Sequence, residues 1–159
     1  MQANWKTLGI GVVSFAVLVL ISTASWALTK RDLRRQDSRG AVSVTVTYLN
    51  PLGKVRGDTL DFEVRMNTHS VDLDGFAVEK LAVLRGLEGG EVRSLGWFDP
   101  GGGGHHRFGI LRFPLKDASG KLLLPGGKGT VELRIRGIAD PATRVFQWKV
   151  PLPSKTAAK

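Results

Sequence analysis

Two patterns of hydrophobic and polar residues divide this chain. Residues 8–28 form one uncharged apolar run of 21 residues. From residue 42 onward, apolar and polar residues alternate one by one in short segments between glycine-rich stretches. A run of about 20 apolar residues is long enough for a helix to cross a bilayer, and strict alternation is typical of strands with one buried face. The chain is therefore expected to join one transmembrane helix to one β domain.

The alternating segments predict seven short strands and no amphipathic helix. They cover residues 42–48, 60–66, 81–85, 92–98, 107–113, 131–136 and 146–150. Turn residues separate these segments, and short strands at such spacing favour a sandwich of two sheets. The predicted fold is therefore all-β, a seven-stranded, mainly antiparallel sandwich of immunoglobulin-like type behind the N-terminal transmembrane helix.

The alternation also predicts which side chains are buried. Neighbouring residues of a strand point to opposite faces, so the register decides which set enters the core. The residues expected in the core are Phe62, Val64, Leu133, Ile135, Phe146 and Trp148. Those expected to face solvent are Glu63, Arg65, Arg134 and Arg136.

Four parts of the chain follow from these patterns. Residues 1–29 are expected to be the membrane anchor, or an uncleaved signal. Residues 30–40 are polar, basic and without periodicity, which is typical of a stalk. Residues 41–152 would form the sandwich, and residues 153–159 a polar tail. Pro151 is expected to end the last strand, because proline cannot donate to a sheet ladder.

The fate and direction of the apolar run have two interpretations each. Small residues at positions such as Ser25 and Ala27 favour signal-peptidase cleavage, whereas the length of the run and Trp26 favour a retained anchor. Basic residues after the run favour a cytoplasmic domain, but the short N-terminal lead favours export. We expect a retained single-pass helix that contacts membrane lipid through residues 8–28, with the sandwich on the periplasmic or extracellular side of the cytoplasmic membrane.

Charge and composition narrow the classes of partner. The net charge is +9, and four basic residues directly follow the apolar run: Lys30, Arg31, Arg34 and Arg35. A basic segment beside a membrane is attracted to anionic lipid headgroups. Within the strands, however, basic and acidic residues alternate, so nucleic acid is not an expected partner. The chain contains no cysteine, which excludes disulfides, iron–sulfur clusters and thiolate metal sites.

The three histidines are the candidate metal ligands. His69 lies in an aspartate-containing segment, and His105 and His106 follow four glycines. Together with Asp72, they are ligand types that Zn²⁺ or Cu²⁺ accepts. Adjacent histidines on an extended chain point in opposite directions, so one of the pair would join His69. Alternatively, the histidines hydrogen-bond within loops, and Asp72 and Asp74 stabilise a turn.

The same two segments carry a family resemblance. They are Thr68-His69-Ser70-Val71-Asp72-Leu73-Asp74 and Gly103-Gly104-His105-His106-Arg107, followed by Gly109, Leu111 and Phe113. In this pairing, residues 41–150 resemble a small uncharacterised exported domain of prokaryotes. The resemblance implies an exported β domain and draws attention to the histidines, but it implies no activity.

No catalytic motif stands out, and a serine nucleophile elbow is absent from the sequence. We therefore expect a non-catalytic accessory or binding module without a cofactor, which contacts a membrane protein complex or another envelope protein. The alternative is a histidine-based protein that binds Zn²⁺ or Cu²⁺. A hydrolase that uses Asp72, Asp74 and a histidine is a third and weaker hypothesis, because a fold alone does not support an activity.

Overall fold

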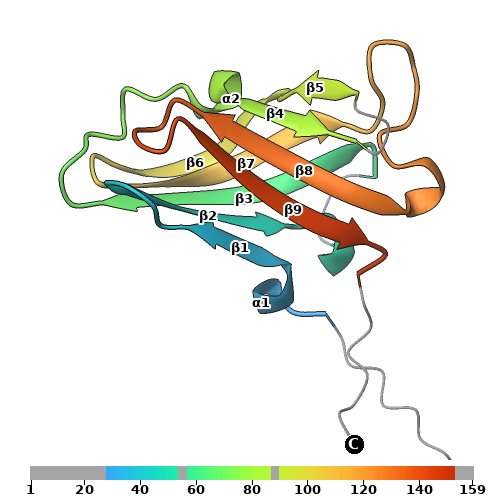
Figure 1. The fold of residues 1–159 in the computed structure, drawn as a ribbon, viewed down its shortest axis with the longest axis horizontal. Helices are drawn as coiled ribbons and strands as arrows, with labels where there is room; N and C mark the ends of the chain where they lie inside the picture. Colours follow the sequence, from blue (N-terminus) through green and yellow to red (C-terminus); the bar gives the residue numbers. More distant parts are fainter. Residues whose placement is uncertain (1–27, 54–56, 87–89, 153–159) are drawn as a thin grey trace, which may run out of the picture.

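A computed structural model describes residues 28–53, 57–86 and 90–152 of the chain. These residues are mostly β, with nine strands in two antiparallel sheets and few helices. Figure 1 shows the two sheets as stacked layers. The predicted all-β class is therefore confirmed at this level.

Sheet A contains five strands in the order β1-β2-β3-β7-β6. Their bounds are β1 (Arg34–Asp37), β2 (Val42–Tyr48), β3 (Thr59–Thr68), β7 (His106–Pro114) and β6 (Gly96–Gly103). Sheet B has the order β5-β4-β8-β9, with β5 (Glu91–Arg93), β4 (Ala82–Arg85), β8 (Gly129–Arg136) and β9 (Thr143–Val150). The remaining regular elements are short helical turns: α1 (Lys30–Leu33), η1 (Asn50–Leu52), α2 (Val78–Leu81) and η2 (Pro125–Gly127).

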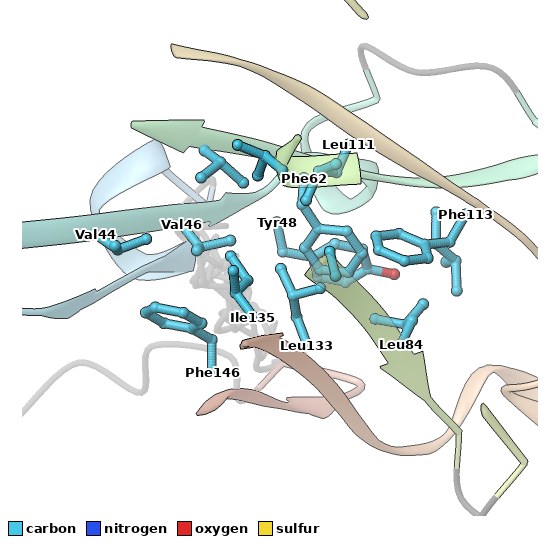
Figure 2. Packing of buried hydrophobic residues seen from close by; sticks show 14 of the residues in the cluster. Val44, Val46, Tyr48, Phe62, Leu84, Leu111, Phe113, Leu133, Ile135 and Phe146 are labelled. Atoms are coloured by element: carbon cyan, nitrogen blue, oxygen red, sulfur yellow. The ribbon is translucent and has the colours of Figure 1, made fainter. Parts of the chain in front are cut away.

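One hydrophobic core lies between the sheets. All six residues predicted for it are at most 2% exposed, and both sheets contribute to the same cluster (Figure 2). The Phe62 ring is its centre: it lies 5.0 Å from the Tyr48 ring, 5.8 Å from Phe113 and 5.3 Å from Trp148, measured between centroids. Aromatic pairs at such distances contribute beyond the area that they bury.

The prediction of seven strands is wrong in one segment because residues 92–98 do not form a single strand. The chain leaves sheet B after β5 and enters sheet A at β6. Ser94 makes this break: its Oγ accepts a hydrogen bond from the Gly96 N–H at 3.0 Å and donates to the Gly96 carbonyl at 2.9 Å. A side chain that bonds to nearby backbone offers an alternative to the sheet ladder.

The expected stalk at residues 30–40 instead holds α1 and β1. Asp32 accepts hydrogen bonds from the Thr29 N–H at 3.0 Å and the Thr29 hydroxyl at 2.7 Å, and these bonds fix the first turn. Leu33 is completely buried, and the Trp148 indole N–H donates to its carbonyl at 2.6 Å. β1 then pairs with β2 along all four of its residues, and Figure 1 shows α1 beside the start of β1. This segment is therefore part of the sandwich.

A buried ion pair holds the C-terminal end of β1 on the sandwich. The guanidinium of Arg144, on β9, is 1% exposed and lies 3.1 Å from an Asp37 carboxylate oxygen. The same group donates to the carbonyls of Arg39 at 2.9 Å and Asp140 at 2.7 Å. A buried charge needs partners of this kind to offset its lost hydration. Arg144 thus joins the β1–β2 turn to the β8–β9 turn.

Two predicted segments lie largely outside the described residues. These are the apolar run, of which only Leu28 is described, and the polar tail, residues 153–159. In the described part of the chain, no helix is long and apolar enough to cross a membrane.

The free energy of unfolding should fall as the pH is lowered from about 4 to about 2. The Arg39 guanidinium, bonded to the Asp37 carboxylate, lowers the pKa of Asp37 from 3.8 to about 2, assisted by the Arg39 N–H and the Arg144 charge and opposed by desolvation. The unfolded chain therefore takes up this proton first. The stabilisation is complete above the unfolded pKa and is lost as the pH falls through the folded value.

Urea unfolding of the wild type and Asp37→Asn in mild detergent at several pH values measures this effect. The difference in unfolding free energy between the wild type and Asp37→Asn should shrink as the pH is lowered from about 4 to about 2. Asp99→Asn is the matched control, because that side chain is 76% exposed. A difference between the wild type and Asp37→Asn that does not change with pH contradicts the assignment.

Candidate binding surface

The structure brings together the two segments that contain the histidines. The Thr68 N–H donates to the His105 carbonyl at 3.0 Å, and the Leu73 N–H donates to the Gly104 carbonyl at 2.8 Å. The loop after β3 therefore lies against the tip of the β6–β7 hairpin. These bonds join backbone, so they place the segments side by side without aiming the rings at one point.

The predicted metal ligands do not form a ligand set in this arrangement. His69, His105, His106 and Asp72 are all exposed. His106 Nδ1 lies 2.9 Å from the Asn67 side-chain oxygen, and Asp72 accepts a hydrogen bond from the Asp74 N–H at 3.0 Å. Across the described ranges, no group of three or more histidine, aspartate or glutamate side chains is placed to hold a metal ion. Metal binding stays a prediction without a supporting geometry.

Arg107 and Asp74 organise this loop cluster. The sequence alone suggests for Asp74 a role in a turn or in a hydrolase site, and it suggests no role for Arg107. Arg107 donates to the Leu73 carbonyl at 2.5 Å and the Phe76 carbonyl at 3.0 Å. Asp74 accepts from the Gly104 N–H at 3.0 Å and lies 3.8 Å from the Arg107 guanidinium. One signal was available, because Arg107 shares its face of β7 with the core residues that follow it.

A different feature lies on the outer face of sheet A. It is a basic groove of about 630 Å³, lined by Lys30, Arg31, Arg34, Thr45, Thr47, Glu63, Arg65 and Asn67. Its floor is the outer side of β2 and β3, where alternate residues point away from the core. Residues of α1 and the first residue of β1 form its other side. The groove exists because the expected stalk folds back onto the sheet.

The charges in the basic groove are unbalanced. Desolvation by itself would raise the pKa of Glu63, but hydrogen bonds and charges from Arg65 and Lys30 hold that pKa below 4.5. The Glu63 carboxylate lies 2.7 Å from Arg65 and 3.4 Å from Lys30. The side chains of Arg31 and Arg34 have no hydrogen-bond or ion-pair partner in the described ranges. Four cations thus face one carboxylate, which favours an anionic ligand.

Next to the groove lies an aromatic strip, formed by Phe98, Phe108 and Ile110 on the outer face of β6 and β7. Phe98 pairs with Ile110 across the two strands, and Phe108 is 40% exposed. The Arg65 guanidinium lies 5.1 Å from the centre of the Phe108 ring, a cation–π distance. The ring also lies close over Gly101, where a Cβ would be 2.3 Å from its Cζ. Because Gly101 has no side chain, the Phe108 ring packs directly against the backbone of β6.

Comparisons with known proteins add nothing to this geometry. No protein-family model, no curated protein and no solved structure matches the chain. The resemblance to an exported prokaryotic domain therefore stays a prediction. What the protein binds has to be inferred from the charges and the exposed rings of sheet A.

Replacing Arg107 with methionine should loosen the loop cluster. The methionine keeps most of the apolar stem but leaves the Leu73 and Phe76 carbonyls without their donor. Loss of such bonds costs about 1–3 kcal/mol of unfolding free energy. Hydrogen exchange should accelerate at the Leu73 amide, which donates to Gly104, and stay unchanged at Val64 in the middle of β3. Arg93→Met, which replaces an exposed arginine, is the control. If the Leu73 amide of Arg107→Met exchanges as slowly as in the wild type and in this control, Arg107 does not hold the loop.

Proposed function

We propose that this protein is a membrane-anchored binding module with no catalytic role. Its sandwich lies on the extracytoplasmic side, where it contacts a membrane protein complex or another envelope protein. The single observation that carries the proposal is the aromatic strip on the outer face of sheet A.

The composition of the aromatic strip is typical of a protein-binding surface. Aromatic residues and arginine are enriched at interfaces, where they account for much of the binding energy. Phe98 and Phe108 each lie under an arginine: the guanidinium of Arg112 is 4.2 Å from the Phe98 ring centre, and that of Arg65 is 5.1 Å from the Phe108 ring centre. A partner that covers the rings would bury apolar area already held in place, so little side-chain entropy would be lost.

The side-chain face of β6, rather than its edge, is the expected contact. β6 is the last strand of sheet A, and an unpaired edge is able to bind another strand. Asp99, however, has a φ of 48°, and the ladder shifts register between Phe98 and Gly101. Pro100 also lacks a backbone N–H, which further obstructs an added strand. The partner is therefore expected to lie flat on the strip.

The order of the strands supports an immunoglobulin-like classification of the sandwich. In immunoglobulin domains, strands A, B, E and D form one sheet, opposite a sheet that contains C, F and G. Here β2-β3-β7-β6 corresponds to the first order, and β4-β8-β9 to the second, with β5 beside β4. Many cell-surface domains share this architecture, although the fold alone does not assign a function.

The membrane anchor rests on the sequence. The 21 apolar residues of the run are enough to span a bilayer as a helix. Trp5 and Trp26 lie near opposite ends of the run, as interfacial aromatic residues do. A module held at the membrane in this way would meet its partner at a high local concentration, which reduces the affinity that the strip must provide.

Photocrosslinking in cells tests the partner surface. A photoreactive phenylalanine in place of Phe108 should give a discrete adduct with a membrane or envelope protein. Val145 is the matched control position, because it is 44% exposed but lies on β9 of sheet B. The adduct should be lost when Phe98→Ser is added, since this removes a neighbouring part of the strip.

The substitutions are in exposed or half-buried positions and should leave the fold intact. Circular dichroism of each variant checks this point. Adducts at Val145 that equal those at Phe108, or no adduct at either position, would contradict a partner on the aromatic strip.

A further inference from the structure

We propose that the basic groove binds the phosphate of a phospholipid whose headgroup carries a net negative charge, in the membrane that anchors the chain. The inference rests on the anchor in the proposed function, and it adds a ligand for a second surface beside the aromatic strip. The contact would hold the sandwich in one orientation on the bilayer.

The position of the groove residues in the sequence determines how far from the hydrocarbon of the bilayer they would lie. Lys30 comes two positions after Leu28, the last residue of the apolar run. Two residues of extended chain span at most about 7 Å. The headgroup layer extends roughly 5–8 Å beyond the hydrocarbon on each side. If the run spans the bilayer, Lys30 and Arg31 must therefore lie at headgroup level.

The fold leaves none of the flexible chain length that a stalk would place between the apolar run and the sandwich. The Thr29–Asp32 hydrogen bonds start α1 directly after the run. Leu33 is completely buried and its carbonyl is bound by Trp148. Arg35 also donates to the Gln147 carbonyl at 3.1 Å. The groove is therefore held beside the point where the chain would enter the membrane.

The groove has the chemistry that a phosphate diester needs. Arg31 and Arg34 are the cations without a partner among the described residues, and a guanidinium binds phosphate oxygens through two parallel hydrogen bonds. Thr45 lines the floor and adds a hydroxyl donor. Glu63, which would repel an anion, is already paired with Lys30 and Arg65. An acidic protein segment is the competing occupant, but it would have to displace the lipid phosphates that lie at the same depth.

Nuclear magnetic resonance of the full chain in detergent micelles tests the proposal. Phosphatidylglycerol, phosphatidylcholine and inorganic phosphate are titrated separately. Phosphatidylglycerol should shift the backbone amides of residues 30–35 and 63–67, and should leave those of β4 and β9 unchanged. A response of equal size to phosphatidylcholine, or no response in the groove, would overturn the proposal. A response to inorganic phosphate as strong as to phosphatidylglycerol would also overturn it, because the site would then not be specific for lipid.

The double variant Arg31→Gln, Arg34→Gln is the decisive comparison. Each basic residue near an anionic surface contributes about fivefold to binding, so the double variant should bind phosphatidylglycerol on the order of 20-fold more weakly. The matched control is Arg93→Gln, Arg136→Gln, which removes two exposed charges from sheet B. Its affinity should equal that of the wild type, and an equal loss in both variants would mean that only net charge matters.

The intact mass of the same sample separates this proposal from the proposed function. A mature N-terminus at Ser25 or Leu28 would show that the run is a signal peptide, and the anchor would then be wrong. The titration decides the lipid contact independently of that result. If no photocrosslink forms at Phe108 but phosphatidylglycerol still shifts the groove amides, the protein partner is rejected and the lipid contact is retained.

Discussion

The arrangement of the surfaces depends on one buried contact between the beginning and the end of the domain. Trp148, on the last strand, donates its indole N–H to the carbonyl of Leu33, and both side chains are completely buried. A donor and an acceptor buried without each other would cost about 1–3 kcal/mol. This contact holds α1 and β1 on the sandwich. The basic residues of this segment therefore form one side of the groove.

The same face of sheet A carries two surfaces that meet at Arg65. Its guanidinium lies 2.7 Å from the Glu63 carboxylate in the basic groove and 5.1 Å from the ring centre of Phe108 in the aromatic strip. Arg65 therefore belongs to both surfaces, and a ligand of either one would lie next to its side chain.

The alternation of apolar and polar residues predicts the core of the domain but not its boundaries. Val64 and Ile135 were assigned correctly because their strands are long and one face is consistently apolar. β1 was missed because it has only four residues, and the buried one is Asp37, whose burial depends on Arg144 from β9. Asp61 also belongs to the polar set of β3, yet it is 3% exposed because Arg112 and Thr59 cover and bind it. Partners distant in sequence decide such cases, and a local pattern does not contain them.

Hydrogen exchange of the full chain in lipid nanodiscs tests the central claim most directly, which is that the domain begins at the membrane without a flexible stalk. We predict that the amides of residues 32–37 that bond within α1 or to β2 exchange as slowly as those of residues 44–47 in the middle of sheet A. Slow exchange at these positions requires stable hydrogen bonds, because opening of the segment would expose them to water. Exchange at the rate of an unstructured peptide in residues 32–37, with β2 still protected, would contradict the account.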